Sequence, residues 1–162
     1  KVFIAEVLLR RTDADQVNTI YEEFMEIYSS PQKLSNADEQ NLRRLIESLG
    51  LINRRSKTLL NSAAKFVEEH DGKVPKKHRS LRNIDGIGNY IAGATLLFGH
   101  QEPEPIIDPN IVRSLERAMD VEFPERYRKK GIVMNLMDEL TPSKPEIARS
   151  FYFALIDRGA ML

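Results

Sequence analysis

Apolar residues recur every three to four positions along almost the whole chain, a spacing typical of helices that bury one face. No segment of useful length alternates apolar and polar residues, as a half-buried strand would. The spacing predicts helices near 1–11, 14–28, 37–48, 54–70, 77–84, 88–99, 109–119, 125–140 and 145–158. We therefore expect an all-α fold.

One polar link, residues 101–105 (QEPEP), is the strongest candidate for a boundary within the chain. The 162 residues suffice for one large domain or for two small ones that share an interface. With the boundary at this link, we expect a larger helical block at 1–104 and a smaller one at 105–162.

Charge is balanced overall but is unevenly distributed. The chain carries 24 basic and 24 acidic residues, so its net charge gives no indication of a polyanionic partner. Residues 54–82, however, hold nine Lys or Arg against three Asp or Glu. Such a segment can neutralise phosphates, although an ordinary solvated helix face would have the same composition.

Several classes of protein are excluded by what the sequence lacks. Without cysteine, these residues form no disulfide and hold no cysteine-ligated metal or iron-sulfur cluster. There is no P-loop, dinucleotide-binding fingerprint, His-rich metal spacing or serine-hydrolase elbow. There is also no signal peptide and no apolar run long enough to span a membrane. We therefore expect an intracellular protein, in the cytoplasm and nucleoid or in the nucleus, with no membrane partner.

Two closely spaced glycines lie between a predicted short helix and a predicted apolar helix. In Asp85-Gly86-Ile87-Gly88 they permit a tight hairpin and close approach of a partner to the backbone. The second helix would begin with N–H groups directed outward, where an anion binds favourably. A Gly-x-Gly alone usually marks only a helix-turn-helix, but basic residues precede this one. They are Lys73, Lys76, Lys77, Arg79 and Arg82. Together these features predict contact with nucleic acid.

Two carboxylates stand where catalysis is plausible, and each also has a structural interpretation. Glu6 is the only charged residue in the apolar segment 2–9 (VFIAEVLL). In a cleft, desolvation would raise the pKa of Glu6 and suit it to proton donation, whereas an exposed stripe or an internal hydrogen bond would make it structural. Asp108 precedes Pro109, as the N-cap of a helix does. A helix N-terminus favours an ionised carboxylate, which can stabilise a positively charged sugar transition state.

The order of these motifs resembles that of the helix-hairpin-helix (HhH-GPD) base-excision DNA glycosylases over nearly the whole chain. Within that family the sequence looks most like the Mig-type thymine/uracil mismatch glycosylases and MutY. The resemblance is carried by residues 6–12 (EVLLRRT), 70–75 (HDGKVP) and 85–90 (DGIGNY), by Ile107-Asp108 with Val112-Arg113, and by residues 157–161 (DRGAM).

The resemblance implies a two-lobed all-helical fold. Residues 1–104 would form most of a six-helix lobe that contains the helix-hairpin-helix at about 81–94. Residues 105–162 would form a second, smaller helical lobe, lacking its N-terminal helix and any iron-sulfur loop. No cofactor is expected within this chain, and a 4Fe-4S cluster is expected only if the full-length protein extends beyond Leu162.

The resemblance also implies which residues contact DNA. Arg10 and Arg11 occupy the place of the residue that fills the gap left by an extruded base, and Arg11 is the favoured one. The hairpin would bind a DNA phosphate through its backbone, often with a monovalent cation at its carbonyls. The hairpin residues are Gly86, Ile87, Gly88 and Asn89.

The implied catalytic residues are Asp108, Glu6 and Tyr90. Asp108 would stabilise the sugar, and Glu6 would donate a proton or hydrogen bond toward the leaving base or organise the water. Family members that cut the backbone carry Lys at the position of Tyr90, because an amine forms the Schiff base. MutY carries a small hydroxyl residue there, and the Mig-type enzymes carry Tyr. Tyr90 therefore predicts a monofunctional N-glycosylase.

The expected function is hydrolysis of the N-glycosidic bond of a mismatched thymine or uracil opposite guanine, in base excision repair. The partner would be double-stranded DNA with a mismatched or damaged base, and the protein a monomer. Two alternatives stay open. One is a MutY-like adenine glycosylase acting opposite oxidised guanine, which Glu6 suits and Tyr90 opposes. The other is a non-catalytic DNA-binding helix-hairpin-helix domain, in which Glu6 and Asp108 are only structural.

Overall fold

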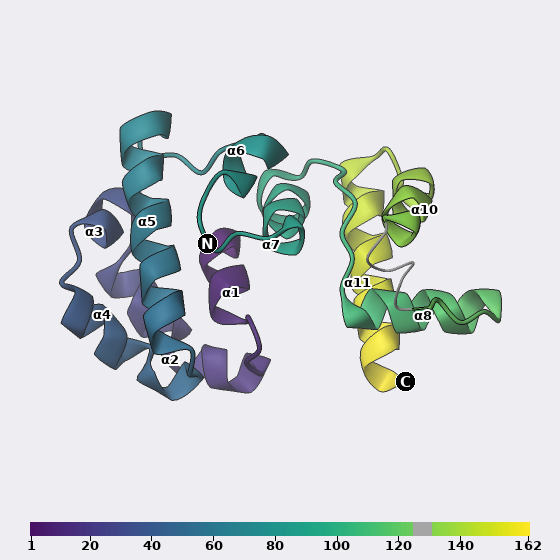
Figure 1. Ribbon diagram of the computed structural model, residues 1–162, viewed down its shortest axis with the longest axis horizontal. Helices are drawn as coiled ribbons and strands as arrows, with labels where there is room; N and C mark the ends of the chain where they lie inside the picture. Colours follow the sequence, from purple (N-terminus) through teal and green to yellow (C-terminus); the bar gives the residue numbers. More distant parts are fainter. Residues whose placement is uncertain (125–130) are drawn as a thin grey trace. The chain divides into compact units, whose positions relative to one another are not determined.

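The computed structural model describes residues 1–124 and 131–162, and within these ranges the chain is helical and contains no strand. The all-α fold predicted from the apolar spacing is therefore confirmed. The chain divides into two compact units, Lys1–Ala92 and Gly93–Leu162 (Figure 1). This division precedes the polar link at 101–105, and the domain extents 1–104 and 105–162 stay a prediction.

The first unit is arranged around one long helix, α5. Helices α1, α3 and α4 pack against α5, and α2 packs against α1 (Figure 1). The elements in chain order are α1 (Val2–Leu8), α2 (Ala14–Ile27), α3 (Pro31–Ser35), α4 (Glu39–Leu45), the 3-10 turn η1 (Glu47–Leu49), α5 (Ile52–His70) and α6 (His78–Arg82). Helix α7 (Asn89–Ala94) then begins in this unit and ends in the second.

The helix predicted near 37–48 is shorter than expected, and a helix that was not predicted, α3, precedes it. Ser30 begins α3 because its side chain accepts the N–H of Lys33, with Pro31 in the first turn. Asp38 begins α4, since its carboxylate accepts the N–H of Asn41 at 2.8 Å. Each break therefore coincides with a capping side chain.

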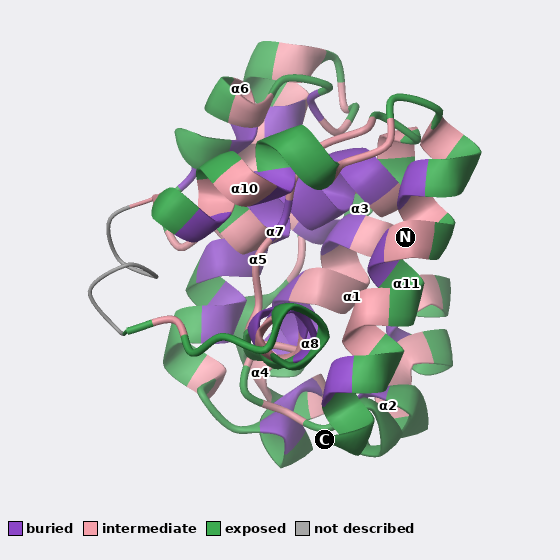
Figure 2. Ribbon diagram, turned by 90° about the vertical axis from the view of Figure 1, so that its right-hand side faces the viewer, coloured by how far each residue is buried: buried purple, intermediate pink, exposed green. Residues whose placement is uncertain are grey.

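The core of the first unit is formed by the apolar faces of these helices. Phe3 of α1 meets Phe66 of α5 edge-on, with ring centroids 5.0 Å apart. Figure 2 shows the resulting alternation of buried and exposed residues along the helices. The largest fully buried side chains of this unit are Phe24, Leu8, Leu42, Ile46, Leu59 and Leu81. Full burial of such a side chain contributes roughly 1.5–3 kcal/mol, so this core fixes the segments that carry the site.

The second unit is built on the long helix α11 (Pro145–Met161), which packs along α8 (Pro109–Met119). Gly159 permits this close packing, because a Cβ there would lie 1.9 Å from the carbonyl oxygen of Asn110. Arg113 Nε then donates to the carbonyl of Gly159 at 3.0 Å. The first turn of α8, which follows Asp108, is therefore held directly by α11.

Two further elements of this unit differ from the predicted helices. The helix predicted over 88–99 ends as α7 at Ala94 and continues as a π-helical turn, η2 (Thr95–His100), which packs against α11. The helix predicted over 125–140 appears as α10 (Ile132–Leu140), and its first part, 125–130, lies outside the described residues.

The segment that leads into α8 is fixed by a buried tyrosine. The hydroxyl of Tyr152 accepts the N–H of Ile106 at 3.3 Å and lies 2.6 Å from the hydroxyl of Thr141. Tyr152 is fully buried, and burial raises the pKa of its phenol. Since Ile106 stands two residues before Asp108, this bond helps to set where the carboxylate lies.

Candidate functional site

The hairpin predicted at 85–88 is present between α6 and α7. Ile84 and Ile87 are both buried, and the N–H of Ile87 donates to the carbonyl of Ile84 at 3.1 Å. Gly86 has φ +88°, and a Cβ there would lie 2.2 Å from the hydroxyl oxygen of Thr58. By contrast, a Cβ on Gly88 would meet nothing within 4 Å. Gly86 is therefore required by the fold, while the exposed backbone at Gly88 is open to a partner.

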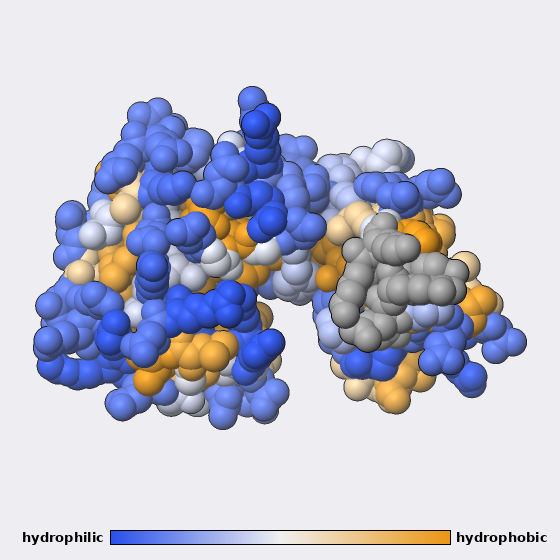
Figure 3. Space-filling model, viewed as in Figure 1, coloured by the Kyte–Doolittle hydropathy of each residue, from blue (hydrophilic) through white to orange (hydrophobic). Residues whose placement is uncertain are grey.

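Basic residues near the hairpin fall into two groups. Lys65 Nζ donates to the carbonyl of Asn83 at 2.8 Å, and Arg82 donates to the carbonyl of Ile87. These two side chains hold the hairpin in its conformation. A second group is exposed around α6, where Figure 3 shows a hydrophilic surface. Its members are Lys73, Lys76, Lys77 and Arg79. Because these side chains are exposed and positively charged, they can contact phosphates.

The loop after α1 carries the two arginines predicted to contact DNA. Arg11 is exposed and adopts a left-handed backbone conformation, with φ +55°. Arg10 is half-buried, and its Nη1 donates to the carbonyl of Gly86 at 3.2 Å. Burial, together with the nearby Arg54 and Arg11, lowers the pKa of Arg10. The structure thus brings this loop and the hairpin together in one cluster of positive charge.

The hairpin carbonyls have partners that bear on the expected monovalent cation. Those of Gly86 and Ile87 accept hydrogen bonds from the guanidinium groups of Arg10 and Arg82. A cation at the same carbonyls would stand beside two fixed positive charges, and like charges repel. The residues present therefore do not fit a cation at these two carbonyls.

The three predicted catalytic residues are divided between the units. Glu6 lies on α1 and Tyr90 near the start of α7, both half-buried and both in the first unit. Asp108 belongs to the second unit, where its Oδ1 accepts the N–H of Ile111 at 2.7 Å and its Oδ2 accepts from Asn110 Nδ2 at 3.3 Å. Asp108 is thus the N-cap of α8, as its sequence predicts, while the catalytic roles stay predictions.

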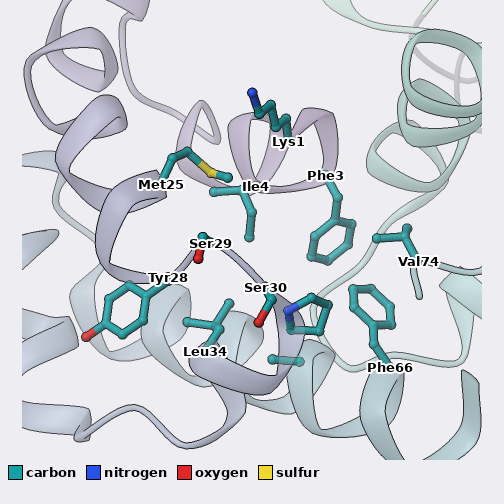
Figure 4. Close-up of a pocket in the computed structure, with 12 residues that line it drawn as sticks. Lys1, Phe3, Ile4, Met25, Tyr28, Ser29, Ser30, Leu34, Phe66 and Val74 are labelled. Atoms are coloured by element: carbon teal, nitrogen blue, oxygen red, sulfur yellow. The ribbon is translucent and has the colours of Figure 1, made fainter. Parts of the chain in front are cut away.

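A small apolar pocket in the first unit lies apart from these residues (Figure 4). It is lined by Lys1, Phe3, Ile4, Met25, Tyr28, Ser29, Ser30, Pro31, Leu34, Ala63, Phe66 and Val74. None of these is a predicted site residue, and none is a carboxylate. The pocket therefore contains none of the predicted catalytic residues. Elsewhere, the described residues contain no cluster of His, Cys, Asp and Glu that could hold a metal ion.

Arg55 is the site residue that the sequence analysis did not single out. It belongs to the basic segment 54–82, whose composition predicts contact with phosphates, yet it is 3% exposed. Its guanidinium donates instead to the carbonyl of Arg10 and the hydroxyl of Thr12, at 2.9 and 2.8 Å. The signal was its position on α5, because Arg55 shares the buried face of this helix with Leu59 and Phe66.

The fold and the site define an all-helical protein with a helix-hairpin-helix, and comparison with known proteins agrees. Residues 4–142 match the HhH-GPD superfamily of base excision DNA repair proteins. The chain belongs to this superfamily.

Two relatives and one solved structure show which members of the superfamily this chain is similar to. The chain is 33% identical to a thymine-DNA glycosylase of Aeropyrum pernix over 96% of its own length and 70% of the relative's. It is 32% identical to a thymine/uracil-DNA glycosylase of Pyrobaculum aerophilum, over 96% of its own length and 68% of the relative's. A solved structure of a thermostable thymine-DNA glycosylase superposes with a TM-score of 0.86 at 25% identity, covering 99% of this chain and 73% of that one.

Proposed function

We propose that this protein, a DNA glycosylase of base excision repair, releases thymine or uracil mispaired with guanine in double-stranded DNA. The observation that carries the proposal is the hydrogen bond from Arg10 to Gly86, because it joins the two predicted DNA-contacting segments into one surface. The choice of base is supported by the two relatives, whose names specify thymine and uracil.

The first step is extrusion of the mispaired base. Extrusion from the stack costs a few kcal/mol, and it costs least for a mispaired base. The exposed Arg11 fills the vacated position in the duplex. Meanwhile the backbone of the hairpin, from Gly86 to Asn89, holds a phosphate, with the exposed lysines and arginine around α6 adding attraction for the strand.

The second step is hydrolysis of the N-glycosidic bond. The electron pair of the breaking bond passes to the base, and Glu6 donates a proton or a hydrogen bond to it. Positive charge develops on the sugar, and the carboxylate of Asp108 stabilises this charge and orients the water. The water oxygen bonds to the sugar carbon as its proton passes to the carboxylate of Asp108. The N–H of Ile111 and the amide of Asn110 hold that carboxylate in position.

Tyr90 decides what the product is. Its side chain packs against the extruded nucleotide and offers no amine for an imine with the sugar. The product is therefore an abasic site in an intact strand.

We propose that the protein acts as a monomer. Its partner, DNA, places it where the genome is, and no described helix is long and apolar enough to cross a membrane.

The experiment is a panel of duplexes that differ in a single base pair. Single-turnover release is measured for G:T, G:U, oxidised-guanine:A and a matched A:T pair. The proposal predicts release from G:T and G:U and none from A:T. Release of adenine alone would instead assign the MutY-like activity and make Glu6 the next residue to substitute. Binding without any release would assign the non-catalytic interpretation.

A further inference from the structure

Arg55 is a buried arginine in the first unit whose observed partners are all uncharged. Its guanidinium donates to five backbone carbonyls and to one hydroxyl. Burying a guanidinium is costly unless its N–H groups are hydrogen-bonded, and Arg55 meets that requirement without a carboxylate at these contacts. Burial, and then the neighbouring Arg10, lower its pKa. We call Arg55 and these acceptors the clamp. Because the clamp is built on a charged side chain, packing alone does not explain it.

The acceptors belong to two segments far apart in the sequence. One segment is the end of α1 and the loop after it, where Arg55 Nη2 donates to the carbonyls of Leu8 and Arg10 at 3.2 and 2.9 Å. The other is the turn before α5, where Nη1 donates to the carbonyl of Leu49 at 2.9 Å. The side chain of Arg55 thus joins these two segments.

Thr12 completes the clamp at the far end of the loop. Its hydroxyl accepts from Arg55 at 2.8 Å and donates to the carbonyl of Leu49 at 3.0 Å. Loop residues 9–12 are therefore held at both ends, and Arg11 lies between the held positions in its left-handed conformation. That conformation is strained for a residue with a Cβ, so it persists only where the surroundings impose it.

We propose that Arg55 is a positioning residue for base extrusion, which holds loop 9–12 so that Arg11 faces the DNA and Arg10 reaches the hairpin. The inference rests on the proposed function. Arg55 is too buried to contact DNA, so it acts through the other two arginines.

The distribution of charge supports a role in DNA binding over one in stability alone. Burial, and then Arg54 and Arg11, lower the pKa of Arg10, and burial, and then Arg10, lower that of Arg55. The second cause in each case is repulsion between guanidinium groups. A clamp needed only for folding gains nothing from this repulsion. A phosphate backbone beside the cluster would offset it.

The test is a double-mutant cycle between Arg55 and Arg11 on a duplex that reports extrusion. The duplex carries guanine opposite a non-cleavable 2′-fluoro-uridine, with fluorescent 2-aminopurine beside the uridine. A separate G:U duplex gives the single-turnover rate of base release.

Three variants are compared with the wild-type protein. Arg55→Lys keeps the charge but places all its donors on one nitrogen atom, which cannot reach both segments. Thr12→Val removes only the hydroxyl, and serves if Arg55→Lys does not fold. Arg43→Lys is the control, because Arg43 pairs with Glu39 at 2.7 Å on α4.

We expect Arg55→Lys to unfold cooperatively and to lower the fluorescence rise and the rate by about tenfold, equivalent to about 1.4 kcal/mol. Arg43→Lys should change neither. Because Arg55 acts through the loop, the variant with both Arg55→Lys and Arg11→Ala should be no slower than Arg11→Ala alone. Losses that multiply in the double variant, or wild-type fluorescence in Arg55→Lys and Thr12→Val, would overturn the inference. An inactive wild-type protein would instead refute the proposed function, and the fluorescence rise would still report on Arg55.

Discussion

The guanidinium of Arg10 donates a hydrogen bond to the backbone carbonyl of Gly86, with 3.2 Å between Nη1 and the oxygen. The two residues are 76 positions apart, and each belongs to a segment predicted to contact DNA. One contact therefore couples the loop that would enter the duplex to the hairpin that would hold the strand.

Replacing Arg10 with Met should weaken DNA binding while the fold persists. A hydrogen bond from a charged donor contributes about 1.5–3 kcal/mol, and its loss also removes a charge near the phosphates. We expect at least a tenfold weaker affinity for a duplex containing an abasic site, measured by fluorescence anisotropy. Unfolding should stay cooperative, with its thermal midpoint lowered by no more than roughly 12 °C, because 1 kcal/mol shifts the midpoint by roughly 2–4 °C in a chain of this size. Unchanged affinity would show that the contact with Gly86 does not assist binding.

Gly86→Ala should destabilise the protein by about 2 kcal/mol or more, because the new methyl group meets Thr58 and the residue has a positive φ. Gly88→Ala is the matched variant, since a Cβ there meets nothing within 4 Å. Its free energy of unfolding should change by less than about 0.5 kcal/mol. Urea denaturation of both variants tests this. Equal free energies of unfolding for the two variants would show that Gly86 does not adopt this positive φ beside Thr58.

Asp108→Asn should abolish base release and leave folding and DNA binding intact. Asn caps a helix about as well as Asp, so α8 should keep its N-terminus while the negative charge is lost. We expect a rate at least a hundredfold lower, read from single-turnover assays on G:T and G:U duplexes.

Asp38→Asn is the control for this prediction. Asp38 caps α4 in the same way, with its Oδ1 2.8 Å from the N–H of Asn41, and it lies outside the candidate site. Its variant should release bases at the wild-type rate. If Asp108→Asn is equally active, Asp108 has only its capping role.

Tyr90→Lys should add strand cleavage to base release. An amine at this position can form an imine with the opened sugar, which tyrosine cannot do. Treatment with borohydride should then trap a covalent complex with DNA in this variant, visible as a shifted band on a denaturing gel. Tyr90→Phe should yield no trapped complex. Trapping by the wild-type protein would show that another amine reaches the sugar.

The parts of the site that the sequence predicts are those whose determinants are neighbours along the chain. Asp108 next to Pro109 predicts a helix N-terminus, and Gly86 near Gly88 predicts the hairpin, because capping and left-handed turns depend on a few adjacent residues. Helix spacing likewise predicts α2 and α8 closely. Helix boundaries were missed where a polar side chain caps the backbone within a segment of helical spacing, as Ser30 does at the start of α3.

Tertiary contacts are what the sequence did not reveal. Arg55 has the helical spacing of Leu59 and Phe66, which Arg54 lacks, but this spacing does not show what the guanidinium binds. Only the path of the chain shows that Arg55 is buried against the loop after α1 while Arg54 is exposed. The bond between Arg10 and Gly86 depends in the same way on α5, which carries Arg55 against the loop after α1 and Thr58 beside Gly86. A sequence pattern could place the charges in one segment, but only the fold shows which charges remain available to DNA.

The most direct test of the central claim is base release from end-labelled G:T and G:U duplexes, each analysed with and without alkaline treatment. We predict strand breaks at the position of the mispaired pyrimidine after alkali and intact strands without it, because the enzyme hydrolyses the glycosidic bond and leaves an abasic site. Intact strands after alkali would contradict the glycosylase activity. Breaks that form without alkali would contradict the monofunctional mechanism assigned to Tyr90.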